Sequence, residues 1–483
     1  MSNVRQAIIF SSASKYILRL MSLISTMVIA RLLTPGEIGT FAIASAVVMV
    51  MSEFRMLGAG MYLIREKELT PDKIRSALGL TIMISWGTGG GIFFSAPYIA
   101  EFYVLPELEN IFRILAISFF LAPYISIPSA VLSRNFQFKP LFYINVISSM
   151  VGMVTTISLI YMDFSYYSLA LGHTTTIIVE FLIVSMCWPS GASRLPRFRN
   201  IRPVASVGIY GSVTNLFKNT VVTAPDMIIG KMGSITQVGI FSRGLGLVEF
   251  LSQSLMMGVN PVALPYLSET KRTGGSLPFA YTKACVLLGG LVWPVLAVAS
   301  LASLPVIRLF FGDQWDAAAP LAAWLAIWGM FRSTHWFSNS VLLANGKEKA
   351  MVVKEALVFS AYFSGIIIAM PYGLDAVAFA FVIASVWDIL LTSVVLKNLI
   401  GLSIMTFIKG WLPNFAVTAT CWGATFLISN MISFESNEYW LPILIIAAVL
   451  PLVWFLSLKV FNHPLYDELI NLLKGILSKK SQA

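Results

Sequence analysis

The sequence has too few charged residues for a protein that is surrounded by water. Only 12% of its 483 residues are Asp, Glu, Lys or Arg, whereas 57% are hydrophobic. Soluble domains carry roughly 25% charged residues, because their surfaces must stay hydrated. The low charge content therefore excludes a soluble globule and predicts a protein that lies largely within a lipid bilayer.

Residues that bind metals or form disulfides are also scarce. The cysteines lack CxxC spacing and the histidines lie far apart, which excludes the usual metal and disulfide patterns; they are Cys187, Cys285 and Cys421, and His173, His335 and His463. No GxxxxGK[ST] motif occurs, and the glycines at 87 and 89–91 fall inside an apolar run, where they favour close helix packing. We therefore expect no cofactor and no ATP hydrolysis, with Na⁺ or H⁺ left as coupling ions.

Apolar runs that could cross a bilayer recur along the whole chain. A spanning helix needs roughly 20 mostly apolar residues, because hydrocarbon offers the backbone no hydrogen-bonding partner. This criterion predicts an all-α polytopic membrane protein with about fourteen transmembrane helices. The predicted segments are 8–32, 38–54, 77–98, 111–132, 142–161, 166–188, 207–229, 238–257, 284–304, 321–343, 356–370, 376–396, 411–432 and 440–460. A total of about twelve or thirteen remains an alternative, because 207–229 and 238–257 are polar and 356–370 is short.

The loops between these segments alternate in the sign of their charge. Basic residues prevail at 65–75, 134–139, 194–202, 271–272, 347–354, 397–409 and 474–480. Acidic residues prevail at 101–109, 163, 313–316, 375 and 435–438. Because short basic loops stay in the cytoplasm, both termini are predicted to be cytoplasmic. Arg31, Lys231 and Arg308 are exceptions at outer helix ends, and the net charge of +10 needs no nucleic acid as a partner.

Two pairs of segments indicate an internal duplication. Residues 31–41 match 231–241 in their basic, hydroxyl, acid or amide, glycine and aromatic positions. A second match aligns 115–117 with 325–327, 131–132 with 341–342, Asn135 with Asn345 and Lys139 with Lys349. The duplication predicts six-helix lobes at 1–200 and 201–400, two extra helices at 401–462 and an amphipathic cytoplasmic tail at 463–483. Two lobes that face each other suit alternating access, with the substrate between them.

The repeated segments also resemble a known family. The sequence Ala30-Arg31-Leu-Leu-Thr34-Pro-Gly-Glu37-Ile-Gly39 is similar to the motif after the first helix of Wzx-type oligosaccharide flippases, which belong to the multidrug/oligosaccharidyl-lipid/polysaccharide superfamily. Further segments that resemble this family, with the colanic-acid and capsule exporters nearest, are 132–139, 238–243, 311–315 and 343–347. The resemblance extends from the first predicted helix to about the twelfth.

The resemblance implies a function as well as a fold. It implies a flippase in the bacterial inner membrane that moves a polyprenyl-diphosphate-linked oligosaccharide to the periplasmic leaflet by alternating access. The product would be exopolysaccharide, capsule or O-antigen. Membrane lipids surround such a protein, and glycosyltransferases and a polysaccharide polymerase are the partners that the resemblance implies.

Several charged residues lie within or at the ends of predicted spans, where they are energetically costly and therefore invite a functional hypothesis. We expect the cations to bind a diphosphate in a cavity between the lobes; they are Lys15, Arg19, Arg55, Lys218, Arg243 and Arg332. The carboxylates Asp226, Glu180 and Glu53 are candidates for ion coupling. The alternative is that these side chains reach the membrane surface or pair with each other.

Other functions remain open at this point. A multidrug exporter of organic cations would share the fold, but it would favour carboxylates in its cavity. A membrane glycosyltransferase or polymerase would need an acidic site on an outer loop, for which Asp313 and Asp316 are the best pair. A passive channel lacks any filter-like motif. The excess of cations within spans favours an anionic substrate and a transporter that is not an enzyme.

Overall fold

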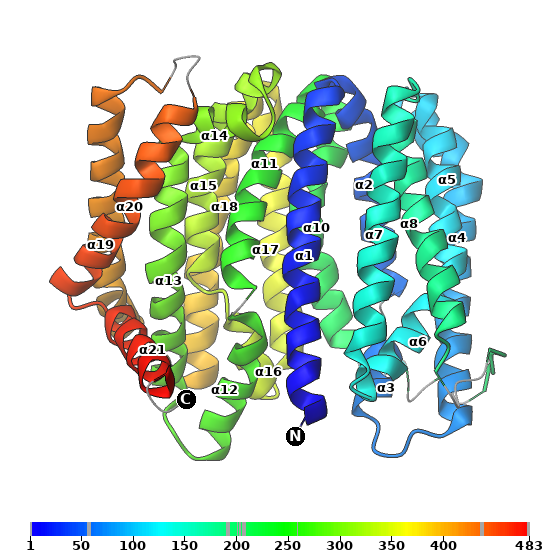
Figure 1. The fold of residues 1–483 in the computed structure, drawn as a ribbon, viewed down its shortest axis with the longest axis horizontal. Coiled ribbons are helices and arrows are strands. Elements are labelled where there is room, and N and C mark those ends of the chain that lie inside the picture. The colour runs from blue at the N-terminus through cyan, green and yellow to red at the C-terminus, as the bar shows by residue number, and fades with distance from the viewer. Residues whose placement is uncertain are drawn as a thin grey trace. The chain divides into compact units, whose positions relative to one another are not determined.

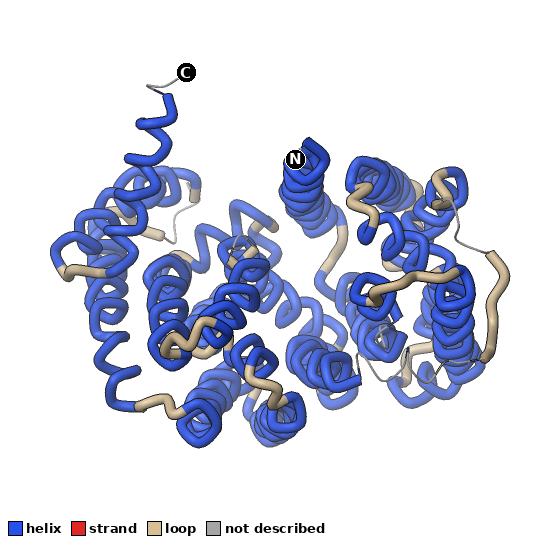
Figure 2. Tube along the Cα trace, turned by 90° about the horizontal axis from the view of Figure 1, so that it is seen from below, coloured by secondary structure: helices blue, strands red, loops and turns tan. Residues whose placement is uncertain are grey.

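The computed structural model consists of helices joined by short loops (Figures 1 and 2). It describes residues 2–55, 59–189, 194–199, 201, 204, 209–257, 259–434 and 439–480, and no strand occurs in these ranges. Arg202, Glu435 and Glu438 therefore lie outside the described residues, as does the side chain of Arg55. The all-α prediction is confirmed.

The chain divides into two compact units, residues Met1–Ser242 and Arg243–Ala483. The first contains α1 (Ser2–Leu32), α2 (Pro35–Arg55), α3 (Ala59–Arg65), α4 (Pro71–Tyr103), α5 (Glu107–Leu121), α6 (Pro123–Arg134), α7 (Phe138–Tyr161), α8 (Tyr167–Met186) and α10 (Ile209–Met232). Helix α11 (Ile235–Met256) runs across the division. The predicted lobe boundary after residue 200 stays a prediction.

The second unit continues with the remaining helices. These are α12 (Asn260–Arg272), α13 (Leu277–Leu301), α14 (Ser303–Phe310), η1 (Asp313–Ala318), α15 (Ala319–Ser333), α16 (Ser338–Ala344), α17 (Glu348–Ala369), η2 (Met370–Tyr372), α18 (Leu374–Ile400), α19 (Ile404–Met431), α20 (Trp440–Val460) and α21 (Pro464–Lys480).

The described parts of the fourteen predicted segments fall on helices, apart from residues at some of their ends and the interior breaks of 111–132 and 321–343. Among the described residues, nine helices are long and apolar enough to span a membrane, or ten if the bent pair α5–α6 forms one span. Large apolar side chains are exposed on them, including Phe94 at 76%, Ile368 at 69% and Leu452 at 67%. Such side chains suit contact with lipid, and the total of fourteen spans stays a prediction.

Two spans that we predicted as continuous are broken, and this part of the prediction is wrong. Helices α5 and α6 meet at an angle of 43° just before Pro123, where proline cannot complete the backbone hydrogen bonds of a straight helix. The span at 321–343 likewise ends as α15 and restarts as α16, with His335 in the turn between them.

The internal repeat has the same local structure in both copies. Helices α6 and α16 both end at an asparagine, Asn135 and Asn345, and the next residue has a left-handed φ, 56° at Phe136 and 69° at Gly346. In both turns a backbone N–H bonds back to a leucine carbonyl at 2.9 Å, from Gln137 to Leu132 and from Lys347 to Leu342. The aligned residues therefore end the helix in the same way.

The first matched pair of segments forms two equivalent helix starts. Thr34 and Glu37 cap α2 reciprocally, with the Thr34 N–H donating to Glu37 Oε2 at 2.8 Å. Ser234 and Gln237 cap α11 in the same way, with the Ser234 N–H donating to Gln237 Oε1 at 2.9 Å. The sequence match thus reflects a shared capping box.

These two helix starts cross at a pair of glycines within the first unit. A Cβ atom on Gly39 would overlap the carbonyl oxygen of Ile235, and one on Gly239 would overlap that of Pro35. Only glycine permits backbones to approach this closely. Because Gly39 and Gly239 are repeat partners, the crossing is nearly symmetric.

The glycines at 87 and 89–91 pack differently from our prediction. A Cβ on Gly89 would lie 2.7 Å from Phe119 Cβ, so close packing is confirmed there. At Gly87, Gly90 and Gly91 nothing lies within 4 Å, so the prediction is wrong for these three. Their side of α4 is open, which leaves room for larger residues.

Loops of the same predicted side lie together within each unit. Arg75 Nε donates to the Leu195 carbonyl at 3.3 Å, and Lys271 Nζ donates to the Ala344 carbonyl at 3.3 Å. Two of the three exceptions to the charge rule have local partners, since Arg308 pairs with Asp316 at 2.7 Å and Lys231 lies 4.3 Å from the Phe102 ring. The alternation of loop charge across the membrane and the side that is cytoplasmic both stay predictions.

The tail helix α21 docks onto the second unit through a buried histidine. His463 is 1% exposed, and its Nδ1 accepts the Leu465 N–H at 3.0 Å. Its Nε2 must then carry a proton, which it donates to Asn414 Oδ1 at 2.6 Å. Burial lowers the pKa of His463 to about 4. An ion pair of Lys283 and Glu468 at 2.8 Å adds a second connection.

We expect substitution at the glycine crossing to destabilise the protein. Gly39→Ala should lower the free energy of unfolding by about 1–3 kcal/mol, because its methyl group meets backbone that cannot yield. The matched control Gly90→Ala places its methyl group in open space inside a helix and should leave the free energy of unfolding unchanged or raise it by up to about 1 kcal/mol. Unfolding in detergent measures both, and equal stability of the two variants would contradict the crossing.

Acid should weaken the docked state of α21. As the pH falls, His463 of the unfolded chain, with a pKa of about 6.5, takes up a proton before the buried His463 of the folded chain does. The stability that this imidazole contributes above pH 6.5 is therefore lost as the pH approaches 4. The expected loss at pH 5 is about 2 kcal/mol. His463→Gln cannot titrate, and its unfolding free energy should depend less on pH than that of the wild type. A pH dependence that is unchanged in this variant would count against the buried neutral imidazole.

Candidate functional site

A polar stripe follows one face of the first helix, α1. Ser12, Lys15, Arg19, Ser22 and Thr26 recur at intervals of three or four residues, which places them on the same face. Ser12, Lys15 and Ser22 are exposed, and Arg19 and Thr26 are half-buried. A stripe of two cations and three hydroxyls is costly against hydrocarbon, so it suits a space that contains water.

The repeat places a second polar stripe on α10. When the two copies of the repeat are aligned through Gly39 and Gly239, the polar positions of α1 correspond to Ser212, Asn215, Asn219 and Asp226. Val222 is the one apolar member of this set. Asn215 and Asn219 are exposed, while Ser212 and Asp226 are half-buried. The sequence analysis identified Asp226 but missed the two asparagines, although the repeat register was sufficient to find them.

Helices α2 and α10 connect through a side-chain hydrogen bond in this region. Asn219 Nδ2 donates to Glu53 Oε1 at 2.8 Å, which gives the half-buried Glu53 a partner within the first unit. Lys218 is half-buried one position before Asn219. Arg55 ends α2 two residues after Glu53. The structure thus brings Glu53 next to the α10 stripe.

In the second unit, Arg332 has an internal partner. It pairs with Glu249 on α11, and the two side chains are 16% and 13% exposed. Gln253 Nε2 donates to the other oxygen of Glu249 at 2.8 Å, and the Trp328 ring lies 4.9 Å from the guanidinium. Arg332 is therefore held in an aromatic and ion-paired setting.

Glu180 belongs to the first unit and Arg243 to the second. Arg243 is half-buried, with its guanidinium 5.4 Å from the Trp315 ring and 5.7 Å from the Phe311 ring. Glu180 is half-buried on α8. None of the predicted site residues lines the groove of about 500 Å³ between α4, α5 and α8, which contains Phe93, Asn110 and Arg113. The binding and coupling roles of the nine predicted residues stay predictions.

A buried polar network in the second unit was not predicted. Lys354 was assigned to a cytoplasmic loop, which is wrong, because α17 begins at Glu348 and the side chain of Lys354 is 4% exposed. Its ammonium lies 2.7 Å from Glu355 Oε1 and 3.2 Å from Ser338 Oγ. Asn339 Nδ2 donates to Glu355 at 2.7 Å. The predicted span began at residue 356, where the apolar run starts. The first turns of α17, which include Lys354, were therefore taken for a loop.

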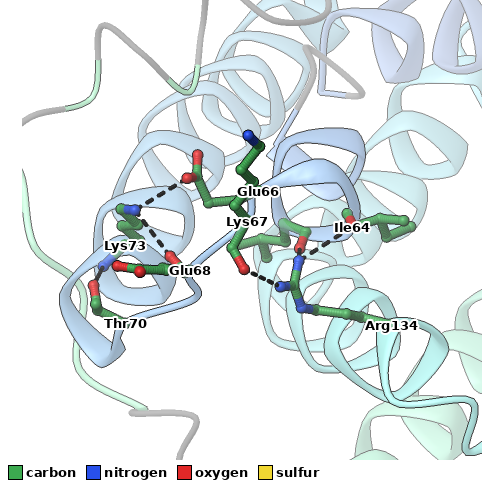
Figure 3. Close-up of polar contacts among 8 residues, drawn as sticks. Ile64, Glu66, Lys67, Glu68, Thr70, Lys73 and Arg134 are labelled. Atoms are coloured by element: carbon green, nitrogen blue, oxygen red, sulfur yellow. Dashed lines mark hydrogen bonds and ion pairs between the residues drawn. The ribbon is translucent and has the colours of Figure 1, made fainter.

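Figure 3 shows a second polar cluster, at the loop end of the first unit. Arg134 donates to the carbonyls of Leu63 at 2.7 Å and Lys67 at 3.2 Å, and thereby caps α3. Lys73 pairs with Glu66 at 3.1 Å, and its hydrogen bond holds the pKa of that carboxyl below its usual range. Two predicted cytoplasmic loops are joined here, so we interpret this cluster as structural.

The acidic pair proposed for catalysis is also engaged in structure. Asp316 accepts two hydrogen bonds from Arg308, at 2.9 Å from Nε and 2.7 Å from Nη2. Asp313 accepts the backbone N–H of Gln314 at 2.9 Å. A carboxylate that is held by a bidentate arginine is a poor general base.

The helical architecture and the sequence both match known proteins. A family model described as "Polysaccharide biosynthesis protein" matches residues 28–320. The chain belongs to this family. The match to a polysaccharide biosynthesis family confirms the family resemblance that the motifs after the first helix indicated.

Two relatives and one solved structure illustrate the match. The teichuronic acid biosynthesis protein TuaB of Bacillus subtilis is 25% identical over 369 residues, which cover 75% of this chain and 76% of TuaB. The succinoglycan biosynthesis transport protein ExoT of Rhizobium meliloti is 22% identical over 311 residues, 63% of this chain and 62% of ExoT. The lipid II flippase MurJ in an inward closed conformation has a TM-score of 0.74 at 16% identity, over 96% of this chain and 100% of MurJ, and confirms the predicted flippase fold.

Proposed function

We propose that this protein is a flippase that moves a polyprenyl-diphosphate-linked oligosaccharide from the cytoplasmic to the periplasmic leaflet of a bacterial inner membrane. The observation that carries the proposal is the cationic stripe of α1 in a member of the polysaccharide biosynthesis family. The names of TuaB and ExoT, one for an acidic polysaccharide and one for transport, support the substrate class.

The chemistry of the stripe fits a diphosphate. Arginine offers a planar fork of donors to phosphate oxygens, and lysine adds a compact positive charge. In the α1 stripe, Lys15 and Arg19 are one helical turn apart and can contact one headgroup together. The hydroxyl and amide groups of the two stripes can exchange hydrogen bonds with the hydroxyls of a moving sugar chain.

The other candidate functions have less support. Helix α1 carries no acidic residue, whereas a cavity for organic cations would favour carboxylates. The engagement of Asp316 with Arg308 argues against catalysis on the outer loop. We therefore propose a transporter without covalent chemistry, with both termini in the cytoplasm, membrane lipids around it, and glycosyltransferases and a polymerase as partners. Asp226, Glu180 and Glu53 remain the proposed ion-coupling residues of the sequence analysis.

Deletion of the gene should trap a complete lipid-linked oligosaccharide in the cytoplasmic leaflet. We expect a membrane-impermeant glycosidase to digest it in inside-out vesicles and not in right-side-out vesicles. A shortened oligosaccharide would instead indicate a glycosyltransferase. A complete but unpolymerised oligosaccharide on the periplasmic side would indicate a polymerase.

The double variant Lys15→Ala/Arg19→Ala should reduce the amount of surface polysaccharide by at least about tenfold, because loss of one charge-assisted contact costs about 1.5–3 kcal/mol. Lys347→Ala/Lys349→Ala removes the same charge from exposed positions outside the stripes and serves as the matched control. Both variants are compared at equal protein level. If the α1 double variant exports polysaccharide at the wild-type level, the stripe does not bind the substrate.

A further inference from the structure

The buried network of the second unit contains more acids than bases. Its charged members are Lys354 and Glu355 on α17, which are buried, and Arg332 on α15, Glu249 on α11 and Asp388 on α18, which are half-buried. Two ion pairs, Arg332 with Glu249 and Lys354 with Glu355, use both cations. Asp388 interacts electrostatically with Lys354, Glu355 and Arg332, and it is the carboxyl in excess.

The position of Asp388 makes an uncompensated charge costly. It lies near the middle of α18 (Leu374–Ile400), roughly 20 Å from either helix end, in a bilayer with a hydrocarbon core of about 30 Å. Its Oδ1 accepts the Thr392 hydroxyl at 2.8 Å. Among the described residues, no cationic nitrogen lies within 4.0 Å of this carboxyl, whereas Glu249 and Glu355 each have one.

A row of hydrogen-bonded groups begins at Ser393, the neighbour of Thr392 on α18. His335 lies in the network with its Nε2 2.9 Å from Ser393 Oγ and its Nδ1 2.7 Å from the Tyr281 hydroxyl. Ser393 follows Thr392, and Tyr281 lies in the second turn of α13. Tyr281 and Tyr362 also interact electrostatically with Asp388. Such a row of exchangeable protons can serve as a proton path.

A metal ion fits this cluster less well than a proton. The Lys354 ammonium already occupies the space beside Glu355, and it would repel Na⁺. Among the described residues, no group of three His, Cys, Asp or Glu side chains could hold a metal ion. Protonation neutralises the excess carboxylate without any further cation.

We propose that Asp388 holds an exchangeable proton inside the second unit, and that its release and uptake couple transport to the proton gradient. The proton leaves the Asp388 carboxyl toward the row of hydroxyls and His335 and returns by the same groups, so no other reactant is needed. The coupling rests on the proposed flippase function, whereas the protonation itself does not.

Infrared difference spectra of the purified full chain in phosphatidylethanolamine–phosphatidylglycerol vesicles test the protonation. The wild type should show the C=O stretch of a protonated carboxyl at neutral pH, with a shift in D₂O and a loss at alkaline pH. Asp388→Asn should lose this band. Asp375→Asn removes an exposed carboxyl from the same helix and should keep it. A band that persists in Asp388→Asn, or is absent from the wild type, would overturn the proposal.

Two further measurements keep the outcomes separate. If Asp388→Asn does not fold, Asp388→Glu should move the band rather than abolish it, and an unmoved band would overturn the site.

In cells, Asp388→Asn should reduce surface polysaccharide at least tenfold relative to Asp375→Asn. Wild-type export by Asp388→Asn would overturn the coupling alone. A shortened lipid-linked oligosaccharide in the deletion strain would overturn the flippase function and leave the infrared result standing.

Discussion

The hydrocarbon around this protein offers no partner to a charge or to a backbone polar group, and the rest of the structure depends on this constraint. Each charged side chain within a span must find water or an internal partner. The second unit satisfies the constraint internally for two of its cations, because Arg332 pairs with Glu249 and Lys354 with Glu355. The α1 stripe leaves Lys15 exposed instead, which requires a space that admits water or an anion.

The internal repeat shows which features the fold needs and which are free to change. Both copies keep the capping boxes, the asparagine helix ends and the crossing glycines, because each of these sets a backbone geometry. The polar stripes keep their spacing but not their charge. Lys15 and Arg19 on α1 correspond to Asn215 and Asn219 on α10. A duplicated fold has thus acquired one cationic and one amide-rich helix, which suits a substrate with a charged head and a neutral glycan.

Much of the fold could be predicted from the sequence, because apolar runs of sufficient length are strong signals. The breaks at Pro123 and around His335 were missed, since helix-compatible residues continue on both sides of each break. Lys354 was misassigned because hydropathy alone places it in a basic loop, whereas its partners Glu355 and Ser338 become visible only in three dimensions. Asp388 is one acid in a long apolar helix, and nothing in the linear sequence shows that charged groups of α15 and α17 lie near it.

Burial also decides which substitutions can reveal function. Removal of one partner from a buried ion pair costs about 3–5 kcal/mol, because the other charge is left without compensation. Loss of Arg332 would therefore leave Glu249 buried and charged, and a drop in export would report on folding as much as on substrate binding. Lys15 is exposed, so its removal leaves no buried charge behind. A loss of export on its removal can accordingly be read as a loss of substrate contact, which is why the α1 stripe carries the functional argument.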